Sequence, residues 1–383
     1  MSGPLSGFKI IELAGIGPGP YAGQLLADMG AEILVVERPG GGLIPGSGLQ
    51  SVDRRGKKSI IVDIRKPEGA AIVLKLVETA DALIEGNRPG VTERLGVGPE
   101  DCHKRNPKLV YGRMTGWGQT GPWSHLAGHD INYISITGAL EAMGRDGEPP
   151  FPPLNFVGDY GGGSLFLVSG ILAALLKAQK TGVGEVVDAA IIDGVSSMMG
   201  IVYSLSSLGL WQTKRKANLL DGAMPYYRCY KTQDDKFMAV GCIEPQFFAL
   251  MLKILEIDPE SFGPQNHPKF KNAQIETLEK IFASKSRDDW AEIFADTDAC
   301  VSPVLNYEEA ANHPQNSARG GLKSVNGMVH PGVAPKFSSD AEPETFEICD
   351  KGEDTRSVLQ SAGYPDDVIE KLLGQDVIFE NKG

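Results

Sequence analysis

The sequence predicts an α/β protein with a parallel sheet in a large domain and a second, smaller α+β domain. In the first third of the chain, short segments with strand character alternate with segments of helical periodicity, a pattern typical of a parallel sheet covered by helices. From about residue 217 the pattern changes to a hairpin followed by helices. A chain of 383 residues is long enough for two or three domains, each with its own core.

The large domain follows from the order of its segments. We expect strands at 8–13, 31–36, 58–64, 81–84 and 108–111, and helices at 21–29 and from Pro67 onward. Proline fits the first turn of a helix, where its missing N–H leaves no bond unmade. The apolar run 165–176 predicts a buried helix, because it is shorter than the roughly 20 residues that a membrane-spanning helix needs.

The smaller domain is predicted from turns and proline positions. Apolar segments at 226–230 and 237–242 flank Gln233-Asp234-Asp235-Lys236 and indicate a β-hairpin. Pro245 can begin a helix over 246–255, and further helical stretches follow at 275–282 and 288–294. The segment 312–339 is rich in Pro, Gly and Asn and is predicted to be a linker, before an amphipathic helix at 365–373.

Composition narrows the class of protein. Apolar content of 42% and charged content of 22% are ordinary for a soluble globular protein, and the net charge of −12 argues against a nucleic-acid-binding surface. The 5 cysteines form no Cys-x-x-Cys pair, which fits a reducing compartment. We find no secretion signal, no membrane span and no peroxisomal tripeptide at Asn381-Lys382-Gly383, so we expect a cytoplasmic protein.

The turn after the first strand resembles a nicotinamide-binding fingerprint. Gly17-x-Gly19-x-x-Ala22 matches the relaxed motif, and Glu37 lies twenty residues further on (37 − 17). However, Pro18 and Pro20 lie inside the turn, and proline has no N–H to donate to a pyrophosphate. We therefore interpret this turn as a packing device. A metal site is also not expected, because Gly128 separates His125 from His129 and no third ligand is near.

Basic residues gather at predicted strand ends and loops of this acidic chain. They are Arg38, the run Arg54-Arg55-Gly56-Lys57-Lys58, Arg88 and Arg94. Open α/β sheets bind ligands beyond the carboxyl ends of their strands, so cations there suit a polyphosphorylated ligand. The alternative is that they are solvated surface charges.

Two ionisable residues beside glycines are the candidates for chemistry. His129 follows Gly128 and Asp159 follows Gly158, and each precedes an apolar segment of helical spacing, 131–140 and 165–176. Helix N-termini favour developing negative charge, so an imidazole and a carboxylate placed there suit proton abstraction next to a carbonyl. The alternative is that Asp130 and Asp159 are helix caps and His129 is a loop histidine.

Several segments that run almost from end to end of the chain together form a specific pattern. They are Glu12-Leu13-Ala14-Gly15-Ile16-Gly17-Pro18-Gly19-Pro20, Glu85-Gly86-Asn87-Arg88-Pro89-Gly90-Val91, Met114-Thr115-Gly116-Trp117-Gly118-Gln119, Gly128-His129-Asp130-Ile131-Asn132-Tyr133, Val157-Gly158-Asp159 and Glu244-Pro245-Gln246-Phe247. With these segments the chain resembles the α-methylacyl-CoA racemases of the family III CoA-transferase superfamily. The resemblance implies a Rossmann-like CoA-binding domain over 1–190, completed by 334–383. It also implies linkers at 191–219 and 310–333 around a small domain at 220–309, and an interlocked homodimer whose active sites are shared between subunits.

The resemblance also assigns roles to residues. His129 and Asp159 correspond to the two catalytic bases, and Glu244 to the partner of the histidine. The residues that correspond to CoA and substrate contacts are Ile16, Arg38, Val62, Asp63, Arg65, Gly86, Asn87, Arg88, Arg94, Gly128, Asp130, Asn132 and Tyr133. CoA would enter as part of the substrate, with no metal and no further cofactor.

The implied reaction is interconversion of (2R)- and (2S)-2-methylacyl-CoA thioesters through an enolate, as in branched-chain fatty acid metabolism. The main alternative is a CoA-transferase of the same fold, with Asp159 as its nucleophile. Transferases of the family carry a glycine-rich loop where this chain has Gly241-Cys242-Ile243-Glu244-Pro245, which favours the racemase. A non-catalytic acyl-CoA-binding protein is a third possibility.

Overall fold

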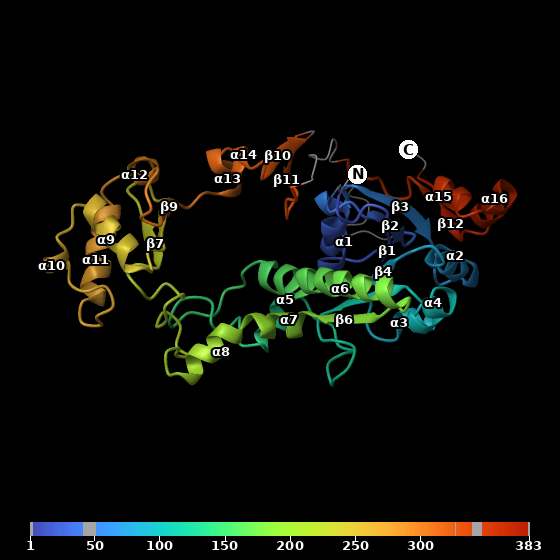
Figure 1. Ribbon diagram of the computed structural model, residues 1–383, viewed down its shortest axis with the longest axis horizontal. Coiled ribbons are helices and arrows are strands. Elements are labelled where there is room, and N and C mark those ends of the chain that lie inside the picture. Colours follow the sequence, from blue (N-terminus) through green and yellow to red (C-terminus); the bar gives the residue numbers. More distant parts are fainter. Residues whose placement is uncertain (1–2, 41–50, 326, 339–346, 382–383) are drawn as a thin grey trace. The chain divides into compact units, whose positions relative to one another are not determined.

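The chain folds as two compact units (Figure 1). The computed structural model describes residues 3–40, 51–325, 327–338 and 347–381. The large unit consists of Met1–Thr137, Pro153–Met198 and Gly320–Gly383, and the small unit of Gly138–Pro152 and Met199–Arg319. The chain therefore passes between the units four times, and residues 334–338 and 347–381 of the predicted C-terminal segment belong to the large unit.

A seven-stranded sheet forms the centre of the large unit, in the order β12-β3-β2-β1-β4-β5-β6. Its strands are β1 (Lys9–Leu13), β2 (Glu32–Glu37), β3 (Lys57–Val62), β4 (Ala82–Glu85), β5 (Val110–Thr115), β6 (Val186–Ala190) and β12 (Ile378–Phe379). All neighbouring pairs are parallel except β12 with β3. The order 3-2-1-4-5-6 is that of a doubly wound fold, so the predicted Rossmann-like sheet is confirmed.

Helices connect these strands. They are α1 (Pro18–Asp28), α2 (Pro67–Val77), α3 (Val91–Arg94), α4 (Pro99–Arg105), α5 (Asp130–Ser135), α6 (Leu165–Thr181), α7 (Ile191–Met198), α15 (Thr355–Ser361) and α16 (Asp366–Gly374), with a 3₁₀ turn η1 (Val52–Arg54) and a π-helical segment η2 (Phe156–Ser164). The predicted start of α2 at Pro67 is confirmed. The first helix was predicted from residue 21 but begins at Pro18, because Pro18 and Pro20 fit the first turn, where amides need no partner inside the helix.

The C-terminal segment completes the core of the large unit. Leu359, Ile369, Leu372 and Ile378 pack with Ile60 and Leu83 of the sheet in one buried cluster. The side chain of Thr355 is also buried there, and its hydroxyl accepts a hydrogen bond from the amide of Ile61 at 3.2 Å. Chain ends far apart in sequence thus form one hydrophobic core.

Helix α6 is only half-buried, whereas the apolar run predicted a buried helix. Its inner face includes Leu167, Ile171 and Leu175, while Leu165 and Leu176 on the opposite side are exposed. The continuous span Phe156–Thr181 is long and apolar enough to cross a membrane, but 50% of its most apolar window is buried inside the protein. Such burial is typical of a core helix.

The small unit is built around a three-stranded antiparallel sheet of β7 (Arg228–Lys231), β8 (Phe237–Val240) and β9 (Val301–Pro303). Its helices are α8 (Gly200–Ser207), α9 (Pro245–Ile254), α10 (Pro259–Phe262), α11 (Lys271–Phe282), α12 (Arg287–Phe294), α13 (Tyr307–Ala311) and α14 (Pro314–Ala318). The predicted hairpin and the helix from Pro245 are confirmed. Aromatic rings fill the core, where Phe282 lies 5.1 Å from Tyr230 and 5.3 Å from Trp290 between ring centroids.

The segments expected to be linkers carry more structure than their composition indicated. Residues 191–219 contain α7 and α8, and residues 310–333 contain α14 and a hairpin of β10 (Leu322–Val325) with β11 (Met328–Pro331). The hairpin belongs to the large unit, where a guanidinium nitrogen of Arg55 donates to the carbonyl oxygen of Pro331. Pro and Gly in this stretch therefore mark turns within an ordered segment.

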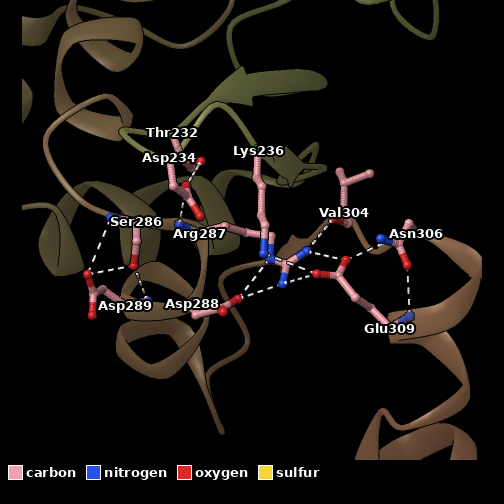
Figure 2. Close-up of polar contacts among 10 residues, drawn as sticks. All are labelled: Thr232, Asp234, Lys236, Ser286, Arg287, Asp288, Asp289, Val304, Asn306 and Glu309. Atoms are coloured by element: carbon pink, nitrogen blue, oxygen red, sulfur yellow. Dashed lines mark hydrogen bonds and ion pairs between the residues drawn. The ribbon is translucent and has the colours of Figure 1, made fainter.

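A buried arginine connects separate segments of the small unit by hydrogen bonds (Figure 2). The guanidinium of Arg287, at the start of α12, donates to both carboxylate oxygens of Glu309 on α13, at 2.6 and 3.0 Å. It also donates to the carbonyl oxygen of Val304 at 3.2 Å and to Asp288. Lys236, beside the β7–β8 hairpin, adds a bond to Glu309 at 3.1 Å. Hydrogen bonds to Arg287 hold the pKa of Glu309 down, at about 2.

We predict that Arg287→Met lowers the free energy of unfolding of the small unit by roughly 1–3 kcal/mol, because Glu309 and the carbonyl oxygen of Val304 lose the hydrogen bonds that the guanidinium donates. The lowered pKa of Glu309 stabilises the fold above its ordinary value of 4.5, and this contribution is lost as the pH falls toward 2. Urea unfolding should therefore show the gap between wild type and variant narrowing below pH 4.5.

The control variant is Arg145→Met. The side chain of Arg145 is 78% exposed, and its guanidinium nitrogen lies 3.8 Å from a carboxylate oxygen of Glu148. It should change the free energy of unfolding by less than about 0.5 kcal/mol. Equal effects of the two substitutions at pH 7 would contradict a structural role for Arg287.

Candidate active site

The sheet topology marks where a ligand binds. The chain leaves β1 and β4, which are neighbours, in opposite directions across the sheet, and such a switch point opens a crevice at the strands' carboxyl ends. A cavity of about 310 Å³ lies beside the loops that follow β4 and β5. Its lining residues are Gly86, Asn87, Arg88, Pro89, Thr115, Gly116, Trp117, Ser124, Leu126, Ala127, Gly128, His129 and Tyr133.

His129 lies at the N-terminus of α5 and lines this cavity. Its backbone is extended, and its amide donates to the side-chain oxygen of Asn132 at 3.1 Å, while the amide of Asn132 donates back to the carbonyl oxygen of His129 at 2.8 Å. The predicted position at a helix start is confirmed. The helix itself is shorter than predicted, because α5 ends at Ser135.

Asp159 lies in the first turn of η2 and approaches α1. A Cβ atom added to Gly17 would lie 3.0 Å from a carboxylate oxygen of Asp159. The hydroxyl of Ser164 joins the two segments, donating to the carbonyl oxygen of Pro18 at 2.7 Å and to that of Asp159 at 3.1 Å. The glycine of the turn after β1 therefore admits a carboxyl group, which agrees with our interpretation of that turn as a packing device.

The carboxyl group of Asp159 has a raised pKa, about 6. Burial is the largest cause, and the negative charge of Asp130 adds to it, while a hydrogen bond from Asn155 and the charge of His129 oppose it. A carboxyl group with such a pKa can both accept and donate a proton near neutral pH, as a general acid–base residue must. His129 and Asp159 are thus close enough to interact electrostatically.

Asp130 connects the two candidate bases. It is the first residue of α5, directly after His129, and its carboxylate accepts a hydrogen bond from the amide of Asp159 at 2.7 Å. The alternative that both aspartates are helix caps is therefore half right. Asp130 satisfies an amide in the first turn of η2, whereas His129 is the N-cap residue of α5 and Asp159 caps neither helix.

Tyr133 closes one side of the cavity between two glycines. A Cβ atom at Gly116 would lie 1.9 Å from its ring, and one at Gly128 2.6 Å, so only glycine fits at either position. The phenol donates to the carbonyl oxygen of Gly128, and the ring meets Trp117 edge-on at 4.8 Å. Burial and the charge of Asp159 raise the pKa of Tyr133, which Arg88 lowers.

The basic residues do not all converge on a ligand, so part of that prediction is wrong. Arg54, Arg55 and Lys57 form ion pairs with Glu37, Asp28 and Glu12 inside the large unit. Lys57 is buried and also donates to the carbonyl oxygen of Pro20 at 2.9 Å, which stabilises the first turn of α1. The charge of a lysine can be buried in this way because a carboxylate already neutralises it.

Other predicted contact residues do lie at the carboxyl edge of the sheet. Ile16, 65% exposed, follows β1, Arg38 is exposed directly after β2, and Val62 ends β3. Asp63 accepts from the guanidinium of Arg65 at 2.8 Å, so this pair carries little net charge. Arg88 lines the cavity, and a guanidinium nitrogen of Arg94 lies 3.2 Å from the Cβ position of Gly90 in the same loop.

Glu244 lies in the small unit, where it is the N-cap residue of α9 and has an extended backbone. Its predicted pairing with His129 stays a prediction. Among the residues that the structure describes, no three His, Cys, Asp or Glu side chains are arranged to hold a metal ion.

A buried carboxylate directly before the cavity-lining loop was missed. Glu85, at the end of β4, is fully buried, accepts from the amide of Asn87 at 2.6 Å and pairs with Arg113 at 3.0 Å. Arg113 also donates to Glu93 at 2.7 Å. A glutamate that ends an apolar strand directly before glycine is the signal that could have identified this support of the loop 86–90.

Comparison with known proteins places the chain in a family. The sequence model of CoA-transferase family III matches residues 5–347 of this chain. The chain belongs to CoA-transferase family III. A mouse protein named alpha-methylacyl-CoA racemase is 39% identical over 380 residues, which cover 99% of this chain and 98% of the relative. The human protein of the same name is 38% identical over 386 residues, again 99% and 98% of the two chains.

The family also includes transferases. An acetyl-CoA:oxalate CoA-transferase from Acetobacter aceti is 31% identical over 360 residues, covering 89% of this chain and 91% of the relative. A solved structure of a CAIB/BAIF family protein from Brucella suis superposes with a TM-score of 0.82 at 26% identity, over 94% of this chain and 100% of that one. The predicted fold family is therefore confirmed.

Proposed function

We propose that the protein is an α-methylacyl-CoA racemase, which interconverts (2R)- and (2S)-2-methylacyl-CoA thioesters. The observation that carries this proposal is the Asp159 carboxyl group, whose pKa is about 6 and which lies within electrostatic reach of His129. The extensive similarity to the mouse and human racemases supports it. A cytoplasmic location and a role in branched-chain fatty acid metabolism are further parts of the proposal.

The chemistry needs two groups that each hold and release a proton. The α-proton of a thioester is more acidic than that of an ester, so a modest base can remove it. One base takes the proton from one face of the α-carbon, and the conjugate acid of the other returns one to the opposite face. Asp159, with a pKa of about 6, can accept a proton in one direction of the reaction and donate one in the other. We propose the amide of Asp130, in the first turn of α5, as a donor to the enolate oxygen.

CoA binding is assigned to the carboxyl edge of the sheet. Arg88 and Asn87 would contact the ligand from the cavity, and Ile16, Arg38 and Arg94 from the neighbouring loops. Glu244 would accept a hydrogen bond from His129 and stabilise its imidazolium form. Since the reaction moves only protons, it calls for no electron carrier.

The second candidate is a CoA-transferase that uses Asp159 as a nucleophile. The 31% identity to an acetyl-CoA:oxalate CoA-transferase favours it. Against it, a carboxyl group with a raised pKa suits proton transfer, and Glu244 replaces the glycine-rich loop that shields acyl-enzyme intermediates. A non-catalytic acyl-CoA-binding protein would not need the close placement of His129 and Asp159.

We further propose a homodimer in which one subunit's large unit and its partner's small unit share each active site. Helix α8 has the sequence Gly-Ile-Val-Tyr-Ser-Leu-Ser-Ser, yet none of its residues is buried. In the large unit, Leu165, Phe166 and Leu176 of α6 are also exposed. Apolar helix faces of this extent are typical of surfaces that a second copy covers.

We predict that the protein converts either epimer of a 2-methylacyl-CoA into a near-equal mixture of the two epimers. Chiral chromatography would measure this conversion. His129→Ala and Asp159→Ala should each lower kcat for racemisation by about 10²–10⁴, the usual contribution of an acid–base group. Asn132→Ala, which removes the acceptor of the bond from the amide of His129 and leaves both bases in place, should cost less.

Racemisation at the wild-type rate in both base variants would contradict the assignment. Transfer of CoA to an added carboxylic acid, with no epimerisation, would establish the transferase instead.

The shared site predicts complementation between two dead variants. If Asp159 and Glu244 of different subunits form one site, a mixed dimer of Asp159→Ala with Glu244→Gln has one doubly altered site and one intact site. Co-refolding of the two inactive homodimers should then recover up to about half of the wild-type activity per heterodimer, because independent sites add. Native mass spectrometry would verify the heterodimer.

If Glu244 instead serves its own chain, every site keeps one lesion. A verified heterodimer that is as inactive as its two parents would therefore rule out sharing of the site between subunits.

A further inference from the structure

The side chain of Asp130 is buried against the backbone of η2. It is 8% exposed, and its Oδ2 atom accepts the hydrogen bond from the amide of Asp159 at 2.7 Å. The amide of Gly158 also donates to this carboxylate. Its other oxygen, Oδ1, is buried and has no hydrogen-bond partner among the residues that the structure describes.

The neighbouring backbone is shaped to admit this carboxylate. A Cβ atom added at Gly158 would lie 2.3 Å from Oδ2 and 2.6 Å from Cγ of Asp130. Glycine at 158 therefore lets the carboxylate approach the first turn of η2 closely enough to bond two successive amides. The contact fixes the backbone from which the Asp159 side chain projects.

A neutral side chain would serve as a helix cap equally well. Ser and Thr accept hydrogen bonds from first-turn amides, and neither would place a second polar atom at the buried position of Oδ1. Such an atom usually costs stability, so its presence calls for a role that a neutral residue cannot fill.

The charges around Asp159 indicate that role. Asp130, His129 and Tyr133 face it from α5, Asn155 bonds it from the start of η2, and Gly17 of the turn before α1 brings no charge. Among these groups Asp130 carries a negative charge as a carboxylate, and this charge opposes ionisation of Asp159.

We propose, on the basis of the racemase function above, that the side chain of Asp130 is a positioning residue for Asp159. Its hydrogen bonds hold the first turn of η2, and its negative charge favours the protonated form of the Asp159 carboxyl group. Asp159 can thereby both accept and donate a proton near neutral pH, as a residue whose role reverses with the direction of the reaction must.

Asp130→Asn tests the charge separately from the hydrogen bond, because the amide oxygen of Asn can still accept from Asp159. The titration of Asp159 is followed by NMR in protein carrying ¹³C-carboxyl aspartate, with Asp159→Asn identifying its resonance. We expect the midpoint to fall by roughly half a pH unit or more, since a like charge has been removed. For the epimer whose α-proton Asp159 removes, the acid limb of the pH profile of kcat/KM should move to lower pH by the same amount.

Asp130→Ser provides a second neutral cap in case the Asn variant does not fold, and it should lower the midpoint in the same direction. The matched control is Asp258→Asn. Asp258 accepts from the amides of Glu260 and Ser261 at the start of α10, as Asp130 does at η2, but in the small unit. It should leave the midpoint of Asp159 and the pH profile unchanged.

An unchanged Asp159 midpoint in a folded, neutral Asp130 variant would overturn the proposal. The NMR titration does not depend on turnover, so the two proposals fail separately. A protein that does not racemise, yet whose Asp159 midpoint falls in Asp130→Asn, would contradict the proposed function and leave the coupling of the two carboxyl groups standing.

Discussion

The site depends on one contact, in which the carboxylate of Asp130 closes the first turn of η2. This bond requires α5 and η2 to begin at nearly the same place, next to the start of α1. Such close approach is possible only where side chains are missing: a Cβ atom at Gly158 would meet Asp130 at 2.3 Å, and one at Gly194 would meet the carbonyl oxygen of Gly162 at 2.0 Å. The glycines of this region are therefore needed for packing, and through packing they place His129 and Asp159 in one site.

Burial, together with the nearby charge of Asp130, makes the site electrostatically unfavourable. The pKa of Asp159 is raised from 3.8 to about 6, mainly by burial and then by Asp130, so the folded protein favours the protonated carboxyl group. This group therefore costs stability as the pH rises from about 3.8 to about 6, and the full cost applies above that range. The network at Arg287 is the opposite case, because there opposite charges lower the pKa of Glu309 and stabilise the fold above pH 4.5. The carboxyl groups of Asp159 and Glu309 therefore affect stability in opposite directions at neutral pH.

Much of the fold could be predicted from the sequence, because local signals determine it. Short segments with strand character between segments of helical periodicity predicted the strands of the first third of the chain, and Pro67 and Pro245 predicted two helix starts. His129 and Asp159 could be recognised as candidates from their glycine neighbours and from the resemblance. Long-range pairing could not be predicted: nothing local shows that Arg54, Arg55 and Lys57 are neutralised by Glu37, Asp28 and Glu12. The bond from the amide of Asp159 to Asp130 spans 29 residues and was missed for the same reason, as was Glu85 directly before the cavity-lining loop.

The central claim is that His129 and Asp159 act on opposite faces of one α-carbon. Exchange of the α-proton in D₂O, measured by mass spectrometry from each pure epimer, tests it most directly. With one base removed, the other can still abstract the proton that faces it and return deuterium to the same face. His129→Ala should therefore exchange one epimer without racemising it, and Asp159→Ala should exchange only the other epimer. Exchange of the same epimer by both variants would contradict the account, because the two groups would then lie on one face.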